Sequence, residues 1–201
     1  MASDQTQVIA GRDLRVYTAP NLSTNAFPLD TVDWGSAWGT PYVDAGFTRD
    51  GLRFRMNVQR QDVNVDQVVD PILRIATRRD LNMTTALAQI NADNLSAATG
   101  QGTVNTIAPT TTVRGHTDYD VSGTITDVFI TAGFDIRNPG DLEAVRIVGW
   151  KGLVTADVEM QFNVTDAARI AFDVALLPDT GLNGNINPAR VARFRDVIAH
   201  T

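Results

Sequence analysis

The chain has 201 residues, which fits one domain of generous size. Its formal net charge of −6 repels nucleic acid and argues against a protein that grips DNA. It contains no cysteine, which excludes disulfides, thiolate metal sites and cysteine nucleophiles.

The sequence predicts neither a membrane-spanning segment nor a secretion signal. No apolar run approaches the roughly 18 residues that a spanning helix needs. Residues 1–12 are polar and lack the apolar segment of a signal peptide. We therefore expect a soluble protein that is made in the cytoplasm.

Residues 1–40 are rich in Ser, Thr, Asn, Asp and Pro, with one short apolar piece at residues 14–17. This composition predicts an extended N-terminal arm. Trp34 and Trp38 lie on the arm and Tyr42 follows it. Aromatic side chains on such a segment pack either against their own domain or against a neighbouring subunit, and the sequence leaves both interpretations open.

From residue 52 the apolar residues recur at every second position, which is typical of a half-buried strand. The alternation covers residues 52–58 and returns at 73–77 and 81–87. The polar stretch 59–70 between them is either strand with a solvated face or a long hairpin loop.

The middle of the chain predicts one helix and one long loop. Small and apolar residues over 88–98 favour a short helix, and Gly100 stands where a C′ glycine would end it. Residues 99–120 are rich in Gly, Thr and Pro, so we expect a loop that is mobile or engaged with a partner.

Strand patterns return in the second half of the chain. Residues 121–136 and 142–151 flank a segment at 138–141 whose Pro and Gly suit a type II turn. Residues 154–162 and 168–176 each alternate over five apolar positions. This pair predicts an antiparallel hairpin that turns at residues 164–166.

A terminal helix is predicted after a loop over residues 178–187. Asn187 suits the N-cap and Pro188 suits the first helical position. Val191, Phe194 and Ile198 then mark one helix face.

These elements predict a mainly β protein. We expect an antiparallel β-sandwich or barrel of about eight strands, with a short internal helix, a C-terminal helix and an extended N-terminal arm. The predicted layout is a single domain over residues 1–201. It comprises an arm at 1–40, a β core at 41–177, and a C-terminal loop and helix at 178–201.

The sequence offers no convincing catalytic or metal-binding motif. His116 and His200 are the two histidines, and neither has partners in a triad or ligand pattern. Asp157 and Glu159 share the polar side of a predicted strand, where a solvated face is a far commoner explanation than glycosidase chemistry. We therefore expect no enzyme activity, no metal and no cofactor.

Several short motifs follow one another in a familiar order. Trp38-Gly39 is followed by Asp-Ala-Gly-Phe-Thr-Arg-Asp-Gly at 44–51, an alternating strand, Val-Asp-Gln at 65–67 and Asp-Pro at 70–71. A threonine-containing strand at 81–86 leads to Leu-Ala-Gln at 87–89, and a late strand runs into Pro-Asp at 178–179. Over roughly residues 38–180 this order resembles the major tail tube proteins of long, non-contractile-tailed bacteriophages. Gln89 departs from the family, which usually has an acidic residue near this position.

The resemblance implies a structural virion protein of the phage tail, assembled in the bacterial host cytoplasm. Its subunits would form homo-oligomeric rings, six to a ring, that stack into a tube through which the DNA passes. The tape measure, terminator and distal tail proteins would be its partners. DNA would be in transit without specific binding, because a lumen that attracted DNA would hold it.

Two sets of residues follow as candidates for these roles. The acidic candidates for the lumen are Asp62, Asp66, Asp157 and Glu159. The candidates for contacts between subunits or rings are Trp34, Trp38, Tyr42, Phe47, Arg53 and Arg55.

Other functions stay open on the sequence alone. A tail terminator or connector, or a capsid decoration protein, shares the fold style but would stop at one ring or trimer. A carbohydrate- or receptor-binding β-sandwich would use exposed loop aromatics such as Trp34, Trp38 and Tyr42. A hydrolase with paired carboxylates and a type VI secretion tube protein are the remaining alternatives.

Overall fold

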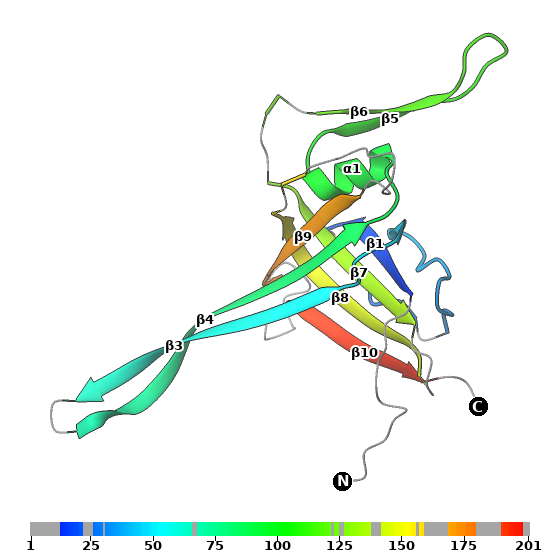
Figure 1. Cartoon of the computed structure of the whole chain (residues 1–201). Coiled ribbons are helices and arrows are strands. Elements are labelled where there is room, and N and C mark those ends of the chain that lie inside the picture. The colour runs from blue at the N-terminus through cyan, green and yellow to red at the C-terminus, as the bar shows by residue number, and fades with distance from the viewer. Residues whose placement is uncertain are drawn as a thin grey trace.

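The computed structural model describes residues 13–21, 26–29, 31–65, 68–121, 123–124, 127–137, 142–155, 157–158, 169–179 and 190–198. Ten strands and one helix are formed by these residues (Figure 1). The elements are β1 (Leu14–Pro20), β2 (Val43–Phe47), β3 (Arg53–Val65), β4 (Val68–Leu87), α1 (Ala92–Thr99), β5 (Thr103–Ile107), β6 (His116–Asp120), β7 (Phe129–Arg137), β8 (Leu142–Val154), β9 (Ile170–Leu177) and β10 (Ala192–Ile198).

Eight strands form one antiparallel sheet in the order β2-β1-β7-β8-β9-β4-β3, with β10 also paired to β8. The sheet curls until its two ends meet. Thr48, just after β2, bridges Leu87 at the end of β4. Main-chain hydrogen bonds from Arg49 N to Ala86 O (3.0 Å) and from Ala88 N to Phe47 O (3.0 Å) support this closure. The prediction of a mainly β, antiparallel sandwich or barrel is confirmed.

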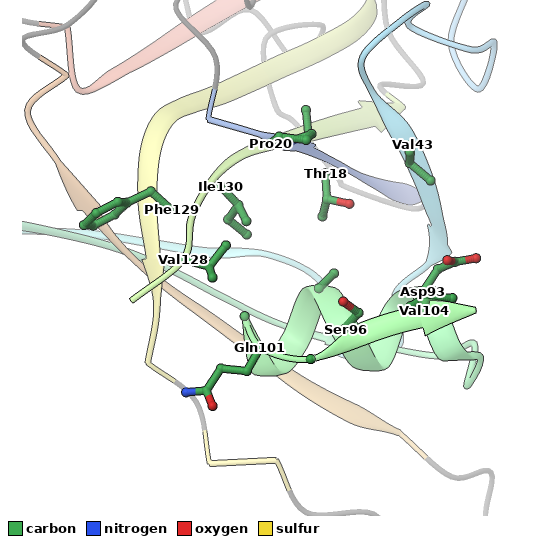
Figure 2. A pocket seen from close by; sticks show the side chains of 14 residues that line it. Thr18, Pro20, Val43, Asp93, Ser96, Gln101, Val104, Val128, Phe129 and Ile130 are labelled. Carbon is green, nitrogen blue, oxygen red and sulfur yellow. The ribbon is translucent and has the colours of Figure 1, made fainter. Parts of the chain in front are cut away.

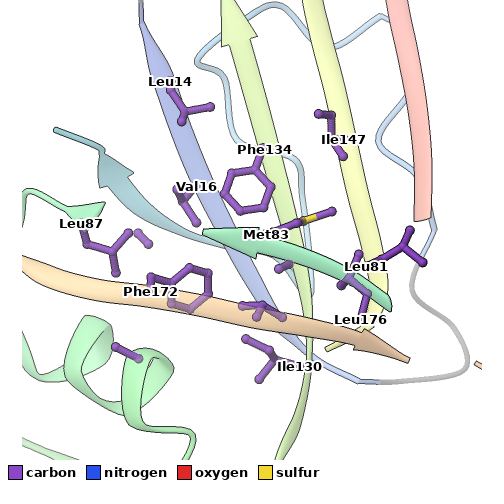
Figure 3. Close-up of a cluster of buried hydrophobic side chains, with 14 of the residues drawn as sticks. Leu14, Val16, Leu81, Met83, Leu87, Ile130, Phe134, Ile147, Phe172 and Leu176 are labelled. Atoms are coloured by element: carbon purple, nitrogen blue, oxygen red, sulfur yellow. The ribbon is translucent and has the colours of Figure 1, made fainter. Parts of the chain in front are cut away.

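The core lies between two layers of the curled sheet (Figure 3). Met83 of β4 and Phe172 of β9 are fully buried on one side, facing Val16 of β1 and Phe134 of β7. The alternation that predicted half-buried strands at 81–87 and 168–176 therefore marks the core-facing side chains.

Helix α1 packs against this core with buried Ala98. The side chain of Asn91 accepts a hydrogen bond from Asn94 N (2.7 Å) and so fixes the first turn. Gly100, at φ 62°, ends the helix as predicted. The helix therefore starts at Ala92 and not at residue 88, because the N-cap asparagine sets the start.

The described part of the predicted N-terminal arm contains a strand of the main sheet. β1 is hydrogen-bonded to β2 on one side and to β7 on the other, with Leu14, Val16 and Tyr17 buried. The arm prediction is wrong for this segment, because one short apolar run suffices for a strand that is paired on both edges. Residues 1–12 lie outside the described residues.

The C-terminal helix prediction is wrong, because β10 is a strand paired with β8 from Ala192↔Gly149 to Ile198↔Leu142. Phe194, which was expected to dock as part of a helix face, is 57% exposed. The helix pattern rested on three positions, and the pairing edge that β8 offers outweighs such a weak preference. The predicted cap residues 187–188 lie outside the described residues.

Strand boundaries differ from the predictions in several places. Residues 59–65 and 68–70 of the polar stretch are strand, because β3 and β4 pair from Arg53↔Thr84 to Val65↔Val68. The predicted loop 99–120 contains the β5–β6 hairpin, with pairs from Thr103↔Asp120 to Ile107↔His116. The strand predicted from 121 begins at Phe129.

The predicted late hairpin is confirmed in part: β9 is the predicted second strand, but of the predicted first strand 154–162 only Val154 is strand, and the other described residues, 155, 157 and 158, are not. β8 and β9 pair antiparallel from Lys151↔Leu177 to Val154↔Val174. The predicted turns at 138–141 and 164–166 lie outside the described residues.

Candidate assembly surfaces

The β3–β4 hairpin projects far from the barrel (Figure 1). β3 has 13 residues, which span about 40 Å at roughly 3.3 Å per residue. At its base, Phe54 and Met56 stand opposite buried Met83 and Leu81. Farther out, over residues 59–78, the described side chains of both strands are exposed on both faces, apart from half-buried Val63.

Large apolar side chains are exposed along this hairpin. Met56 is 58% exposed and Leu73 is 54% exposed. Gln61↔Ile75 and Val63↔Leu73 are neighbouring cross-strand pairs, which places Ile75 and Leu73 on one face beside Val63. Exposed apolar residues that gather on one element mark an interaction surface more often than scattered ones do.

The same hairpin carries a concentration of arginine. Six of the 17 basic residues of the chain lie within residues 53–79, namely Arg53, Arg55, Arg60, Arg74, Arg78 and Arg79. Arg74 pairs with Asp62 at 2.9 Å and Arg78 pairs with Asp80 at 2.7 Å. Both pairs are solvent-exposed, so they add little stability and leave the guanidinium groups accessible to a partner.

The hairpin also carries an unpaired sheet edge. β3 is the last strand in the sheet order, so among the described strands its outer edge has no neighbour. Unpaired strand edges are ready templates for pairing with another chain. Beside the hairpin base lies a cavity of about 370 Å³, lined by Arg55, Asn57, Arg78, Asp80, Leu81, Asn82 and Ala175–Leu177.

A second cavity, of about 300 Å³, lies beside α1 (Figure 2). Helix α1, the end of β1, the start of β2, β5 and the start of β7 form its walls. Most of its lining is small or apolar, and Val43 and Val128 there are more than 40% exposed. Its polar lining side chains are Thr18, Asp93, Ser96 and Gln101.

The β5–β6 hairpin is fixed to the same end of the molecule. The Tyr119 hydroxyl donates to Gln101 O (2.8 Å) and also hydrogen-bonds with the Thr99 hydroxyl at the end of α1. Gly102 has φ 85°, and a side chain there would overlap Asp120 O. The hairpin therefore leaves the helix in a fixed direction, with exposed Val113 in its turn.

The aromatic residues near the N-terminus pack within their own subunit. We call residues 26–29 and 31–42 the strap, because they lie against the outer face of the sheet. Trp38 stacks on Tyr17 with ring centroids 4.4 Å apart and is 7% exposed. Tyr42 meets Trp38 edge-on at 5.3 Å. The guanidinium groups of Arg15 and Arg137 lie over the Trp34 ring, 5.7 Å and 5.4 Å from its centroid.

A fully buried ion pair holds the strap. Arg146 of β8 and Asp135 of β7 are cross-strand neighbours, 3.3 Å apart and both 0% exposed. The Arg146 guanidinium also donates to Leu29 O (3.0 Å) and Val32 O. Asp135 accepts hydrogen bonds from Gly35 N and the Trp38 indole, each at 3.4 Å. Burial raises the pKa of the Asp135 carboxyl, although Arg146 opposes this shift.

A model of the phage tail tube protein family matches residues 1–183 of this chain. The chain belongs to this phage tail tube family. The resemblance inferred from the sequence is thereby confirmed. A search of curated proteins gave no match.

As a tail tube protein, the chain is a structural component of the virion tail, and its family is structural and not enzymatic. Its projecting hairpins and its tightly packed barrel suit such a role. Within the described residues, no three His, Cys, Asp or Glu side chains form a metal-binding group. The same residues contain no helix long and apolar enough to cross a membrane.

The proposed lumen acids are scattered in the tail tube protein. Asp62 lies on the projecting hairpin in its ion pair with Arg74, so its charge is offset locally. Asp157 is exposed just beyond the end of β8. Asp66 and Glu159 lie outside the described residues.

The proposed contact residues fall into two groups. Trp34, Trp38, Tyr42 and Phe47 gather around β1, where Phe47 lies 4.9 Å from the Arg15 guanidinium and is 44% exposed. Arg53 and Arg55 are exposed on β3. Sequence reasoning missed the cavity beside α1 and the buried Asp135–Arg146 pair.

Proposed function

We propose that this tail tube protein self-assembles into stacked rings, six subunits to a ring, that form the tube through which phage DNA passes. The observation that carries the proposal is the projecting β3–β4 hairpin with its exposed apolar side chains. The number of subunits follows from the family resemblance alone. The tape measure, terminator and distal tail proteins are the expected partners, and assembly takes place in the host cytoplasm.

The hairpin needs a partner on energetic grounds. A two-stranded hairpin alone is at best marginally stable in water. Phe54, Met56, Leu73 and Ile75 are each 42–58% exposed. Complete burial of such a side chain contributes about 1.5–3 kcal/mol, so covering the exposed halves contributes roughly 3–6 kcal/mol per hairpin. Each subunit of a ring both offers and receives such contacts, which offsets the entropy lost on association.

The proposed lumen is acidic, so that DNA slides through it without being held. Asp62, Asp66, Asp157 and Glu159 remain the candidates. Asp157 is the described candidate to test first, because Asp62 is neutralised by Arg74. A surface-potential map of the assembled ring tests this part, and a basic lumen would contradict it.

Electron microscopy of the purified chain tests self-assembly. We expect negatively stained rings or hollow tubes that increase over a concentration series, with light scattering that rises in parallel. A single ring that never stacks would instead indicate a tail terminator or connector. A chain that stays monomeric at every concentration would contradict the proposal.

A matched pair of variants tests the role of the hairpin. Leu73→Asp puts a charge on its apolar face, and we expect at least a tenfold rise in the concentration at which rings appear. Phe194→Asp makes the same change at a similarly exposed apolar side chain (57% exposed) on β10, which is not part of the hairpin, and is the control. Circular dichroism checks that both variants fold. Equal assembly of Leu73→Asp and the unmodified chain would show that this face is not a contact surface.

A further inference from the structure

We propose that the cavity beside α1 receives the apolar outer part of the β3–β4 hairpin from a second copy of this chain. The inference rests on the proposed self-assembly and names the two surfaces that meet. The hairpin supplies Leu73 and Ile75, and the cavity supplies Val43, Val128 and Ala97.

The positions of the two surfaces require a second copy. The hairpin leaves the barrel and its far end lies well away from α1, so it points away from the cavity of its own subunit (Figure 1). The β5–β6 hairpin cannot fill the cavity from outside either, because Val104 of β5 is part of the wall. A contact between two different surfaces of identical chains is heterologous. Such a contact is repeated from copy to copy, as a ring or a stacked tube needs.

The cavity suits aliphatic side chains. Its volume of about 300 Å³ is roughly ten times the 30 Å³ that a water molecule occupies in the liquid. Ala19, Ala97, Val104, Val128 and Ile130 line it and offer no hydrogen bonds from their side chains. Branched apolar side chains from a partner would therefore replace water along this apolar part of the wall.

The exposed parts of both surfaces support this fit. Val43 is 55% exposed and Val128 is 43% exposed, so the cavity carries uncovered apolar surface in the isolated subunit. Leu73 and Ile75 on the hairpin are 54% and 47% exposed. One contact would cover all four side chains at once.

The charges around the two surfaces are complementary. The outer half of the hairpin carries Arg60, Arg74, Arg78 and Arg79 against Asp62, Asp66 and Asp70, which leaves a net charge of +1. The α1 end of the molecule carries Asp93, Asp118, Asp120 and Asp127 against Arg114, His116 and Lys151, whose ammonium lies 4.3 Å from the ring centroid of Phe129 in the cavity wall. The hairpin half therefore has a small positive excess and the α1 end an acidic excess, which favours this orientation over a hairpin meeting a hairpin.

The absence of cysteine allows a direct test in the full chain. Leu73→Cys and Val43→Cys are prepared separately, with an affinity tag on one of them. They are mixed under assembly conditions and treated with a short bismaleimide cross-linker. We expect the mixed covalent dimer to form at least ten times more than with Leu73→Cys and Phe194→Cys, whose cysteine lies on exposed β10 away from the cavity.

A second variant controls for cross-links that form by random collision. Ala97→Met fills the cavity from its own side, and we expect it to reduce the 73–43 product at least tenfold while circular dichroism stays unchanged. Rings or tubes that form without a 73–43 product, or with as much 73–194 product, would overturn the docking proposal and leave self-assembly standing. A chain that forms no assemblies at all would overturn both.

Discussion

Replacing Arg146 tests whether the buried ion pair anchors the strap. Arg146→Met keeps an unbranched side chain but removes the guanidinium from Asp135, Leu29 O and Val32 O. Breaking a fully buried pair leaves an uncompensated charge and costs about 3–5 kcal/mol. Since domains are stable by about 5–15 kcal/mol, this is a large fraction of the whole. The midpoint of thermal unfolding should fall by roughly 6–20 °C for a chain of this length.

The assay is urea unfolding of the monomeric protein at low concentration, followed by tryptophan fluorescence. The signal is suitable because Trp34 and Trp38 lie in the strap and Trp150 packs in the same cluster. A parallel chymotrypsin digestion should cut the strap of the variant sooner than that of the unmodified chain.

A double-mutant cycle with Asp135→Asn separates the pair from general damage. We expect Arg146→Met combined with Asp135→Asn to cost less than the sum of the two single changes, by about 0.5–3 kcal/mol. The combined variant has no buried charge left to compensate. Additive effects, or a cost below about 1 kcal/mol for Arg146→Met, would refute the assignment of Asp135 and Arg146 as one buried unit.

Three further tests address a close contact, a buried hydrogen-bonding side chain and the buried carboxyl of the barrel. The methyl group added by Gly133→Ala would overlap the Trp38 ring, so we expect the free energy of unfolding in urea to fall by about 1–3 kcal/mol. Gly123→Ala is the control: it has open space around it, and its free energy of unfolding should change by less than about 0.5 kcal/mol. Asn94→Ala leaves two main-chain carbonyls without their donor and should cost about 1–3 kcal/mol; a neutral result would contradict the role of that side chain. Burial raises the pKa of the Asp135 carboxyl in the folded state above its value near 3.8 in the unfolded chain. The carboxyl therefore contributes most to stability at low pH, and this contribution falls as the pH rises from about 3.8 through the raised pKa of the folded state. The stability of the unmodified chain relative to Asp135→Asn, measured by urea unfolding across this range, should therefore decrease with rising pH, and the opposite slope would contradict the direction of the shift.

The sequence pattern predicted those strands that have one face in the core and the other face in solvent. Met83, Phe172 and Val174 alternate with polar or small neighbours because one face of each strand is buried. The β5–β6 hairpin could not be found this way. Both of its faces are largely exposed, so its threonines and valines follow no two-residue period, and the segment looks like a loop.

The buried ion pair left a signal that pattern analysis did not use. Asp135 and Arg146 are oppositely charged residues inside apolar strands, three residues before and five residues after the predicted turn at 138–141. A hairpin with that turn would place Asp135 opposite Ala144, whereas the observed register of β7 and β8 pairs Asp135 with Arg146. Their full burial was not predictable, because it depends on the strap, whose composition resembles that of an extended arm.

The cavity beside α1 had no sequence signal at all. Its walls come from β1, β2, α1, β5 and β7, which are distant in the chain and meet only after the sheet has curled. Most of its lining residues, such as Ala97 and Val104, are ordinary core types. Only their three-dimensional arrangement leaves a space among them.

The arginines of the β3–β4 hairpin reconcile two needs of an assembling subunit. Exposed strands with Met56, Leu73 and Ile75 risk pairing with any other chain before assembly. Flanking charges lower that risk, and six arginines are placed along these two strands. Lysine would serve this purpose equally well, yet Lys151 is the single lysine of the chain. Guanidinium groups are more weakly hydrated than the lysine ammonium group and bind carboxylates through two hydrogen bonds. The same arginines that keep the hairpins of free subunits from pairing with one another therefore also suit the hairpin to an acidic surface on its partner.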